Sequence, residues 1–338
     1  MLINPFPRLD NIHPVVIPLG NHDLITINCY LLGKGPLTLI DTGPKFSGGL
    51  ELIRKGAEDL GCRLQDIDRI IITHGHMDHF GLVKMLQEEI GRPVICFIHP
   101  QDRYRVLAEN KKEGTWSKEA ESFMARMDMP ATEIRKIGER FDFLNALSDP
   151  IEDPQFMKEG DEFRGEGYHL TLIHTPGHSP GNCCLYESHQ KVLFSGDHII
   201  KHLTPNPILE MDRRNLPDPE YQSLREYMKS LNKLTNMEVR YVFPGHGEYL
   251  TDLKGIIASY GEHHRQRMNL VWEALRRKPR PVFHIIDEVF PYVPPEDVFF
   301  AVSEIYVHLE ILMTEGRAEL IDPGPPTIYG AINSPTDP

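Results

Sequence analysis

The sequence has no apolar run long enough to cross a membrane, and its first residues, MLINPFPRLDN, lack the basic-then-apolar order of a secretory signal. It contains only five cysteines among 338 residues, and Cys183 and Cys184 are neighbours whose side chains would point to opposite faces of a strand. We therefore expect packed thiols instead of disulfides, in a cytoplasmic protein that does not bind a membrane. The formal net charge of −13 disfavours broad nucleic-acid binding, so we do not expect a nucleic-acid partner.

One polar cluster stands out in the segment IITHGHMDHFG, where His74, His76, Asp78 and His79 fall within six residues. An apolar, strand-like stretch precedes the cluster and a helix-like stretch follows it, so the four side chains leave one tight loop together. Gly75 supplies backbone freedom in that loop. Imidazole nitrogen and carboxylate oxygen are the ligands that zinc-type divalent metals prefer. The cluster therefore predicts a metal site.

Three further candidates occur at the ends of apolar, strand-like runs. They are His178 in HTPGHSPGN, Asp197 in VLFSGDH and His246 in YVFPGHGE. Each lies in a turn that contains glycine, and polar residues at the ends of several strands build a pocket along one edge of an open sheet. Taken singly, each residue could instead cap a turn or pack in the core. Together with the first cluster they indicate one site.

Seven ligands are too many for one tetrahedral zinc ion and suit two divalent ions that share a carboxylate. The expected ligands divide into two triads and a bridge: His74, His76 and His178; Asp78, His79 and His246; and Asp197 between them. A hydroxide between the two ions would be the nucleophile, because two Lewis acids lower the pKa of water toward neutrality. A ligand set of nitrogen and oxygen alone fits zinc and also admits iron or manganese.

The order of the motifs HxHxDH, TPGHSPG, SGDH and FPGHG, with a DTGP turn at residues 41–44, resembles the metallo-β-lactamase superfamily over about residues 11–264. The resemblance implies an α/β fold, the αββα sandwich of that superfamily. It also implies that Asp41 is a buried acid that supports the ligand loop without binding metal, although a turn cap fits DTGP equally well. His198, which follows Asp197, could support a ligand, contact substrate or belong to the scaffold.

The sequence divides into a catalytic domain at residues 1–255, with a helical insertion at about 101–160, and a C-terminal appendage at residues 256–338. In the superfamily that the motifs resemble, an insertion at this place overhangs the metal site, so we expect a lid or substrate wall. The insertion also carries Met124, Met127 and Met129, and a methionine-rich helical face is more often core than substrate surface.

The appendage is predicted to contain a long polar helix, a short helix, an apolar helix near residues 297–316 and a hairpin. This α+β order resembles a small winged-helix module. Such a module could pack on the core, build a homodimer or recruit RNA through the basic segment RRKPRP. Acidic residues on the apolar helix, Glu304 and Glu310, favour packing or dimerisation over phosphate binding.

The sequence therefore predicts a metal-dependent hydrolase of a small-molecule substrate. We favour a carboxylic ester, thioester or lactone, which similar sequences without a specialising motif most often cleave. Asp78 is the expected catalytic residue, since it would orient the nucleophile and pass a proton to the leaving group. Phosphodiester or RNA cleavage is the alternative that the appendage raises. A diiron redox role is disfavoured, because His76 stands where that branch of the superfamily uses a carboxylate and no flavodoxin-like segment follows.

Overall fold

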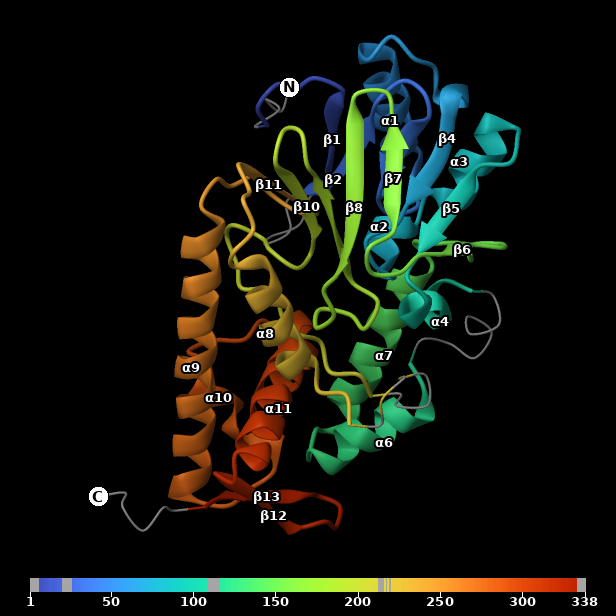
Figure 1. The fold of residues 1–338 in the computed structure, drawn as a ribbon. Helices are drawn as coiled ribbons and strands as arrows, with labels where there is room; N and C mark the ends of the chain where they lie inside the picture. Colours follow the sequence, from blue (N-terminus) through green and yellow to red (C-terminus); the bar gives the residue numbers. More distant parts are fainter. Residues whose placement is uncertain are drawn as a thin grey trace.

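The computed structural model describes residues 6–19, 26–107, 116–211, 216, 218 and 220–332, and within them two β-sheets lie face to face (Figure 1). The first sheet contains, in spatial order, β1 (Ile12–Pro18), β2 (Thr26–Leu32), β3 (Leu37–Ile40), β4 (Ile67–Ile71), β5 (Ile95–Ile98) and β6 (Gln155–Phe156). The second contains β11 (Tyr241–Pro244), β10 (Val192–Gly196), β9 (Cys183–Glu187), β8 (Tyr168–His174) and β7 (Glu162–Gly165). Strands β3 to β6 run parallel, as do β10 and β11, and the other neighbouring pairs of these sheets are antiparallel.

Strand β2 is covered on both faces, since all seven of its residues are buried. Ile27, Cys29 and Leu31 pack in the core beneath helices α1 (Ser47–Asp59) and α3 (Val83–Ile90), whereas Tyr30 and Leu32 belong to the core between the sheets. This alternation follows from the two-residue period of a strand. On the outer face of the second sheet, helices α8 (Ser223–Leu234) and α9 (Leu253–Arg277) form the fourth layer. The predicted αββα sandwich is confirmed.

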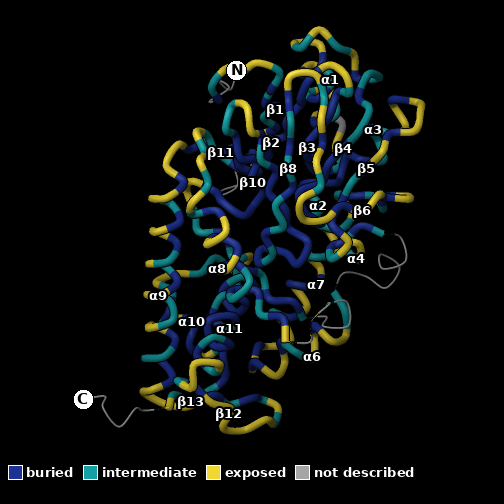
Figure 2. The backbone as a smooth tube through the Cα atoms, viewed as in Figure 1, coloured by how far each residue is buried: buried dark blue, intermediate teal, exposed yellow. Residues whose placement is uncertain are grey.

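The helical insertion and the C-terminal appendage share one hydrophobic core beside the sandwich (Figure 1). The insertion contributes α6 (Lys118–Arg126) and α7 (Ala131–Asn145), which follow the short helix α4 (Arg103–Val106). Met124, Met127 and Met129 are buried in the same cluster as Val302 and Leu309 of helix α11 (Val298–Thr314). Helix α11 is buried along most of its length (Figure 2). The methionine face of the insertion is therefore core, and residues 108–115 of the expected lid lie outside the described residues.

The appendage has the predicted order of elements. The first half of helix α9 packs on the second sheet through Ile257 and Tyr260. Its second half packs in the shared core through Val271 and Leu275, so this helix contacts both predicted domains. The remaining elements are α10 (Ile286–Val289), α11 and the antiparallel hairpin of β12 (Ala318–Asp322) and β13 (Ile328–Ala331).

Short 3-10 turns occur at η1 (Leu64–Asp66), η2 (Pro100–Asp102), η4 (Val282–Ile285) and η5 (Pro295–Asp297). Among the described residues, no helix combines the length and apolar character needed to span a bilayer.

Candidate metal centre

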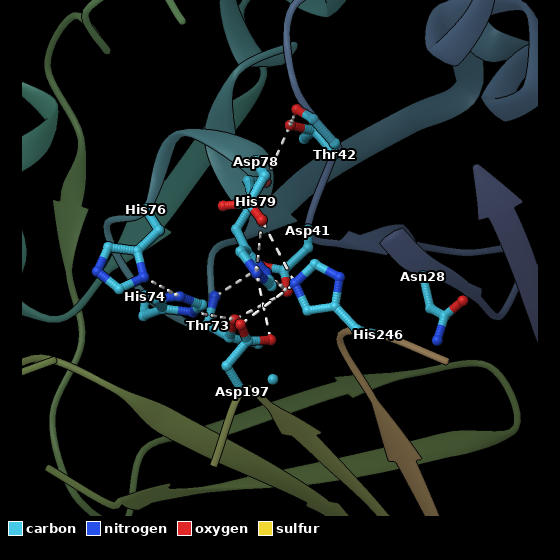
Figure 3. A network of polar contacts seen from close by, with 12 residues as sticks. Asn28, Asp41, Thr42, Thr73, His74, His76, Asp78, His79, Asp197 and His246 are labelled. Atoms are coloured by element: carbon cyan, nitrogen blue, oxygen red, sulfur yellow. Dashed lines mark hydrogen bonds and ion pairs between the residues drawn. The ribbon is translucent and has the colours of Figure 1, made fainter. Parts of the chain in front are cut away.

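The seven predicted ligands meet at one edge of the sandwich, because each leaves a loop at the carboxyl end of a strand. Figure 3 labels all of them except His178. The loop after β4 continues into the single turn α2 (Met77–Phe80), and the other ligands come from the β8–β9 loop and from the ends of β10 and β11. In that order the residues are His74, His76, Asp78 and His79, then His178, Asp197 and His246. Segments far apart in the sequence are thus brought to one point.

Three histidines form the first group. His74 Nε2 lies 2.9 Å from His76 Nδ1, and His76 Nδ1 lies 3.0 Å from His178 Nε2. On its other side, His178 Nδ1 donates a hydrogen bond of 3.1 Å to the carbonyl of Asn206. A proton on Nδ1 leaves the lone pair of His178 Nε2 free to face the other two rings.

The second group consists of Asp78, His79 and His246. His246 Nε2 lies 3.3 Å from Asp78 Oδ2, and its Nδ1 donates to the carbonyl of Thr26 at 2.7 Å. Asp197 lies between the two groups: its Oδ1 is 3.3 Å from His79 Nε2, and its Oδ2 is 3.2 Å from His246 Nε2 and 3.6 Å from His178 Nε2. Its two oxygens therefore face both groups, as expected of a bridging carboxylate.

The donor atoms fit divalent metal ions. Within each of three overlapping triads, which together include all seven residues, one donor atom per residue lies within 4.8 Å of the others. His79 Nε2, His246 Nε2 and Asp197 Oδ1 are buried and form no hydrogen bond within the described part of the chain. Because a buried polar atom without a partner is costly, three such atoms aimed at one another point to cations between them.

The electrostatics of the two groups differ. Burial lowers the pKa of His74 and His76 well below the usual value, so these imidazoles stay neutral and ready to bind a metal. Burial also acts to lower the pKa of His79 and His246, but the adjacent carboxylates outweigh it. They raise the pKa of His79 well above its usual value and that of His246 to about 10. Without a metal, protons on these two rings thus balance the charge of the carboxylates.

Asp41 supports the second group through a hydrogen bond to His79. Its Oδ2 accepts a hydrogen bond of 2.9 Å from His79 Nδ1, and the same carboxylate accepts the Thr73 backbone N–H and hydroxyl, each at 2.8 Å. Asp41 is buried and has a φ of 54°, a left-handed conformation that Asp tolerates better than most residues. The side chain contacts one ligand, His79, and the start of the loop that carries His74, so it supports the ligands.

Three further residues near the site are His198, Asn206 and Asp102. His198 is buried against Tyr227, with ring centroids 4.9 Å apart, and neither ring nitrogen has a hydrogen-bond partner in the described part of the chain, so it supports no ligand through a hydrogen bond. Sequence reasoning missed Asn206, the partner of His178, and Asp102, which accepts hydrogen bonds from both loops that carry the three-histidine group. No local pattern distinguishes either residue, because their partners are distant in the sequence.

Comparison with known proteins decides the family. The model of the metallo-beta-lactamase superfamily matches residues 22–246, which contain all seven candidate ligands. The chain belongs to the metallo-beta-lactamase superfamily. Among solved structures, a metallo-beta-lactamase family protein from Thermus thermophilus superposes on this superfamily member with a TM-score of 0.79 at 24% identity. The match covers 96% of this chain and 99% of that one, so the appendage is part of the shared fold.

Curated relatives also match this superfamily member over most of its length. The probable metallo-hydrolase YqjP of Bacillus subtilis is 27% identical over 308 residues, covering 89% of this chain and 91% of that protein. The atrochrysone carboxyl ACP thioesterase of Aspergillus fumigatus is 24% identical over 323 residues, covering 88% of this chain and 81% of that protein. Membership of the superfamily confirms the predicted class, a metal-dependent hydrolase.

Proposed function

We propose that this protein is a dinuclear metal hydrolase that cleaves a carboxylic ester, thioester or lactone of a small molecule. The main observation behind the proposal is the convergence of five imidazoles and two carboxylates. Three of their buried ligand atoms form no hydrogen bond among the described residues. One ion would be held by the three-histidine group, the other by Asp78, His79 and His246, with Asp197 between them. The many imidazoles favour zinc, with iron and manganese as alternatives.

Divalent ions in such a site act as Lewis acids that polarise an acyl oxygen and lower the pKa of water. The protein itself supplies a proton acceptor in Asp78. Its side chain is 16% exposed, against 6% for Asp197 and 2% for Asp41, so Asp78 is the most accessible of these three carboxylates. Burial acts to raise the pKa of Asp78, but His79 and His246 outweigh it and lower the pKa below its usual value. The ionised carboxylate can accept a proton from water and donate it to the leaving group.

The charge around the site favours an uncharged acyl group over a phosphodiester. Burial is the main cause that lowers the pKa of His76, and the charges of His178 and Arg105 lower it further. The Arg105 guanidinium therefore lies near enough to act on the site. That guanidinium forms an ion pair with the buried Glu210 and lies 3.9 Å from Asp102, so its charge is offset. The anionic oxygens of a phosphodiester would therefore find this guanidinium already paired. The relative named as a thioesterase supports the same choice.

The appendage gives little support to the endoribonuclease alternative. Arg277 and Arg280, both in its basic segment, form ion pairs with Glu288. Arg276 is paired with Glu273. Paired guanidiniums lose part of their attraction for phosphate, which dominates RNA affinity. We therefore propose that the appendage serves packing and not RNA recruitment.

The test combines metal analysis with substrate profiling. Elemental analysis of metal-replete protein is expected to give two equivalents per chain, and a value that stays at one would contradict the dinuclear centre. The same protein is then assayed on aryl ester, thioester, lactone, bis-aryl phosphodiester and RNA. We expect turnover of at least one acyl substrate and its loss in His246→Ala, with His189→Ala, an exposed histidine in the turn between β9 and β10, as the matched control. Turnover of the phosphodiester or RNA alone would favour the alternative.

A further inference from the structure

Asp102 is a fully buried carboxylate at the end of η2, and it ties together two loops of the metal centre. Its Oδ2 accepts hydrogen bonds from the Gly75 backbone N–H at 2.7 Å and from the Ser179 hydroxyl at 2.6 Å. Its Oδ1 accepts the Gly181 backbone N–H at 2.8 Å. Gly75 and Ser179 belong to loops that are about a hundred residues apart in the sequence, and the carboxylate fixes the distance between them.

These two loops carry the whole three-histidine group. Gly75 lies between His74 and His76, and Ser179 directly follows His178. We propose that Asp102 is a positioning residue for the metal ion of this group, one that sets the separation of its ligands without touching the ion. The inference rests on the proposed metal centre and concerns one half of it.

The fit around Asp102 leaves little room for the loops to adjust. A Cβ atom added at Gly181 would lie 2.7 Å from the Asp102 carboxyl carbon, and one added at Gly75 would lie 3.1 Å from the Asp102 Cβ. At Gly181 the approach is too close for a side chain, and at Gly75 a side chain would require its neighbours to shift. Replacement by asparagine keeps the shape but puts an amide N–H where an oxygen was, so at least one of the donors loses its acceptor in either orientation of the amide.

The second half of the centre is held by different groups. His79 donates to Asp41, and His246 donates to the carbonyl of Thr26. Asp78 and His79 follow Gly75 in the chain, but they lie in the helical turn α2, and His79 is held by Asp41. Among the described residues, Asp102 forms no hydrogen bond with the loops that carry Asp197 and His246. Loss of the Asp102 carboxylate should therefore weaken one ion and spare the other.

A purely structural role for Asp102 makes a different prediction, and Glu187 provides the matched control. Glu187 is also fully buried, and its carboxylate accepts the backbone N–H groups of His189 at 3.2 Å and Gln190 at 2.7 Å in the turn after β9. That turn lies at the opposite end of β10 from Asp197. If Asp102 only stabilises the fold, Asp102→Asn and Glu187→Gln will both lower stability and leave metal affinity unchanged.

The experiment is a calorimetric titration of metal-free protein with Zn²⁺, together with elemental analysis and thermal unfolding. We expect Asp102→Asn to lower the affinity for one of the two ions by about 10- to 100-fold, the usual effect of removing a group that orients metal ligands. Glu187→Gln should leave the affinities for both ions unchanged. In a His246→Ala background, Asp102→Asn should weaken the ion that remains. In a His178→Ala background it should add no further loss.

Equal affinities in wild type and Asp102→Asn would overturn the inference, as would an equal loss at both ions. Ser179→Ala, which removes one of the three donors, is the second variant if Asp102→Asn does not fold, and we expect a smaller loss at the same ion. A wild-type protein that binds one ion contradicts the dinuclear proposal instead. The inference is then judged on whether Asp102→Asn weakens that single ion.

Discussion

Replacement of Asp41 by asparagine tests how the second half of the metal centre is organised. Asp41 Oδ2 accepts the proton on His79 Nδ1 at 2.9 Å, and on the other side of the ring His79 Nε2 faces Asp197 Oδ1 at 3.3 Å. In one orientation, the amide of an asparagine would donate to His79 Nδ1 and so favour the tautomer with its proton on Nε2. That proton would occupy the lone pair that a metal needs. In the other orientation, the amide faces the Thr73 backbone N–H and leaves this donor without an acceptor.

The size of the effect follows from these contacts. A buried donor without an acceptor costs about 1–3 kcal/mol, so we expect the unfolding free energy of the metal-free protein to fall by about this amount. Backbone strain adds little, because asparagine tolerates the φ of 54° at this position as well as aspartate does. The affinity for the ion bound by Asp78, His79 and His246 should fall by about 10- to 100-fold, as for other groups that fix the tautomer of a metal ligand.

The assay is urea unfolding of the metal-free protein and a Zn²⁺ titration of Asp41→Asn in a His178→Ala background, which isolates the second ion. Asp102→Asn is the complementary variant, since it is expected to leave this ion unchanged. An unchanged affinity in Asp41→Asn would refute the tautomer argument. In a second titration, of Asp41→Asn with both ligand groups intact, a loss confined to the three-histidine ion would show that the two halves are organised the other way round.

Three further outcomes are expected. Asp78→Ala should lower kcat by at least about 100-fold, the low end for loss of a general acid–base group, and near-normal turnover would remove Asp78 from the mechanism. In the metal-free protein the pKa of His246 is raised to about 10. The stabilisation that the protonated His246 ring gives the fold is therefore complete below the ordinary pKa of histidine, near 6.5, and is lost as pH rises through 10. The Tm of the metal-free protein should therefore fall between pH 7 and 10. Zn²⁺ binding near pH 7.5 should release protons, which calorimetry in buffers of different ionisation enthalpy measures. The absence of proton release would contradict the assignment of His246 as a metal ligand that is protonated in the metal-free protein. Leu309→Ala, in the shared core of insertion and appendage, should cost about 2–5 kcal/mol in urea unfolding, with turnover per folded molecule unchanged; a change in turnover would link this core to catalysis.

The chemistry of the site could be predicted from the sequence, because metal ligands are a matter of side-chain type and of local position. His74, His76, Asp78 and His79 fall in one loop, and each of the other three ligands follows an apolar run that ends in a glycine turn. The structure brings all of these residues together. Some strands were predictable for a similar reason, since a strand that is covered more on one face than on the other leaves a two-residue pattern, as β8 does.

The order of helices and hairpin in the appendage could also be predicted, but not what it packs against. Met124 and Leu309 belong to one core although 185 positions separate them in the sequence, and a helical period shows that a face is apolar without showing its partner.

The residues that orient the ligands were decided by tertiary structure alone. Asp102 looks like any other acidic residue at the start of a helical segment, and Asn206 like any polar residue in a proline-rich loop. Their roles depend on hydrogen bonds to Gly75, Ser179 and His178, which chain folding brings within about 3 Å. The sequence determines which atoms can bind a metal, whereas only the packing of distant loops determines how those atoms are held in place.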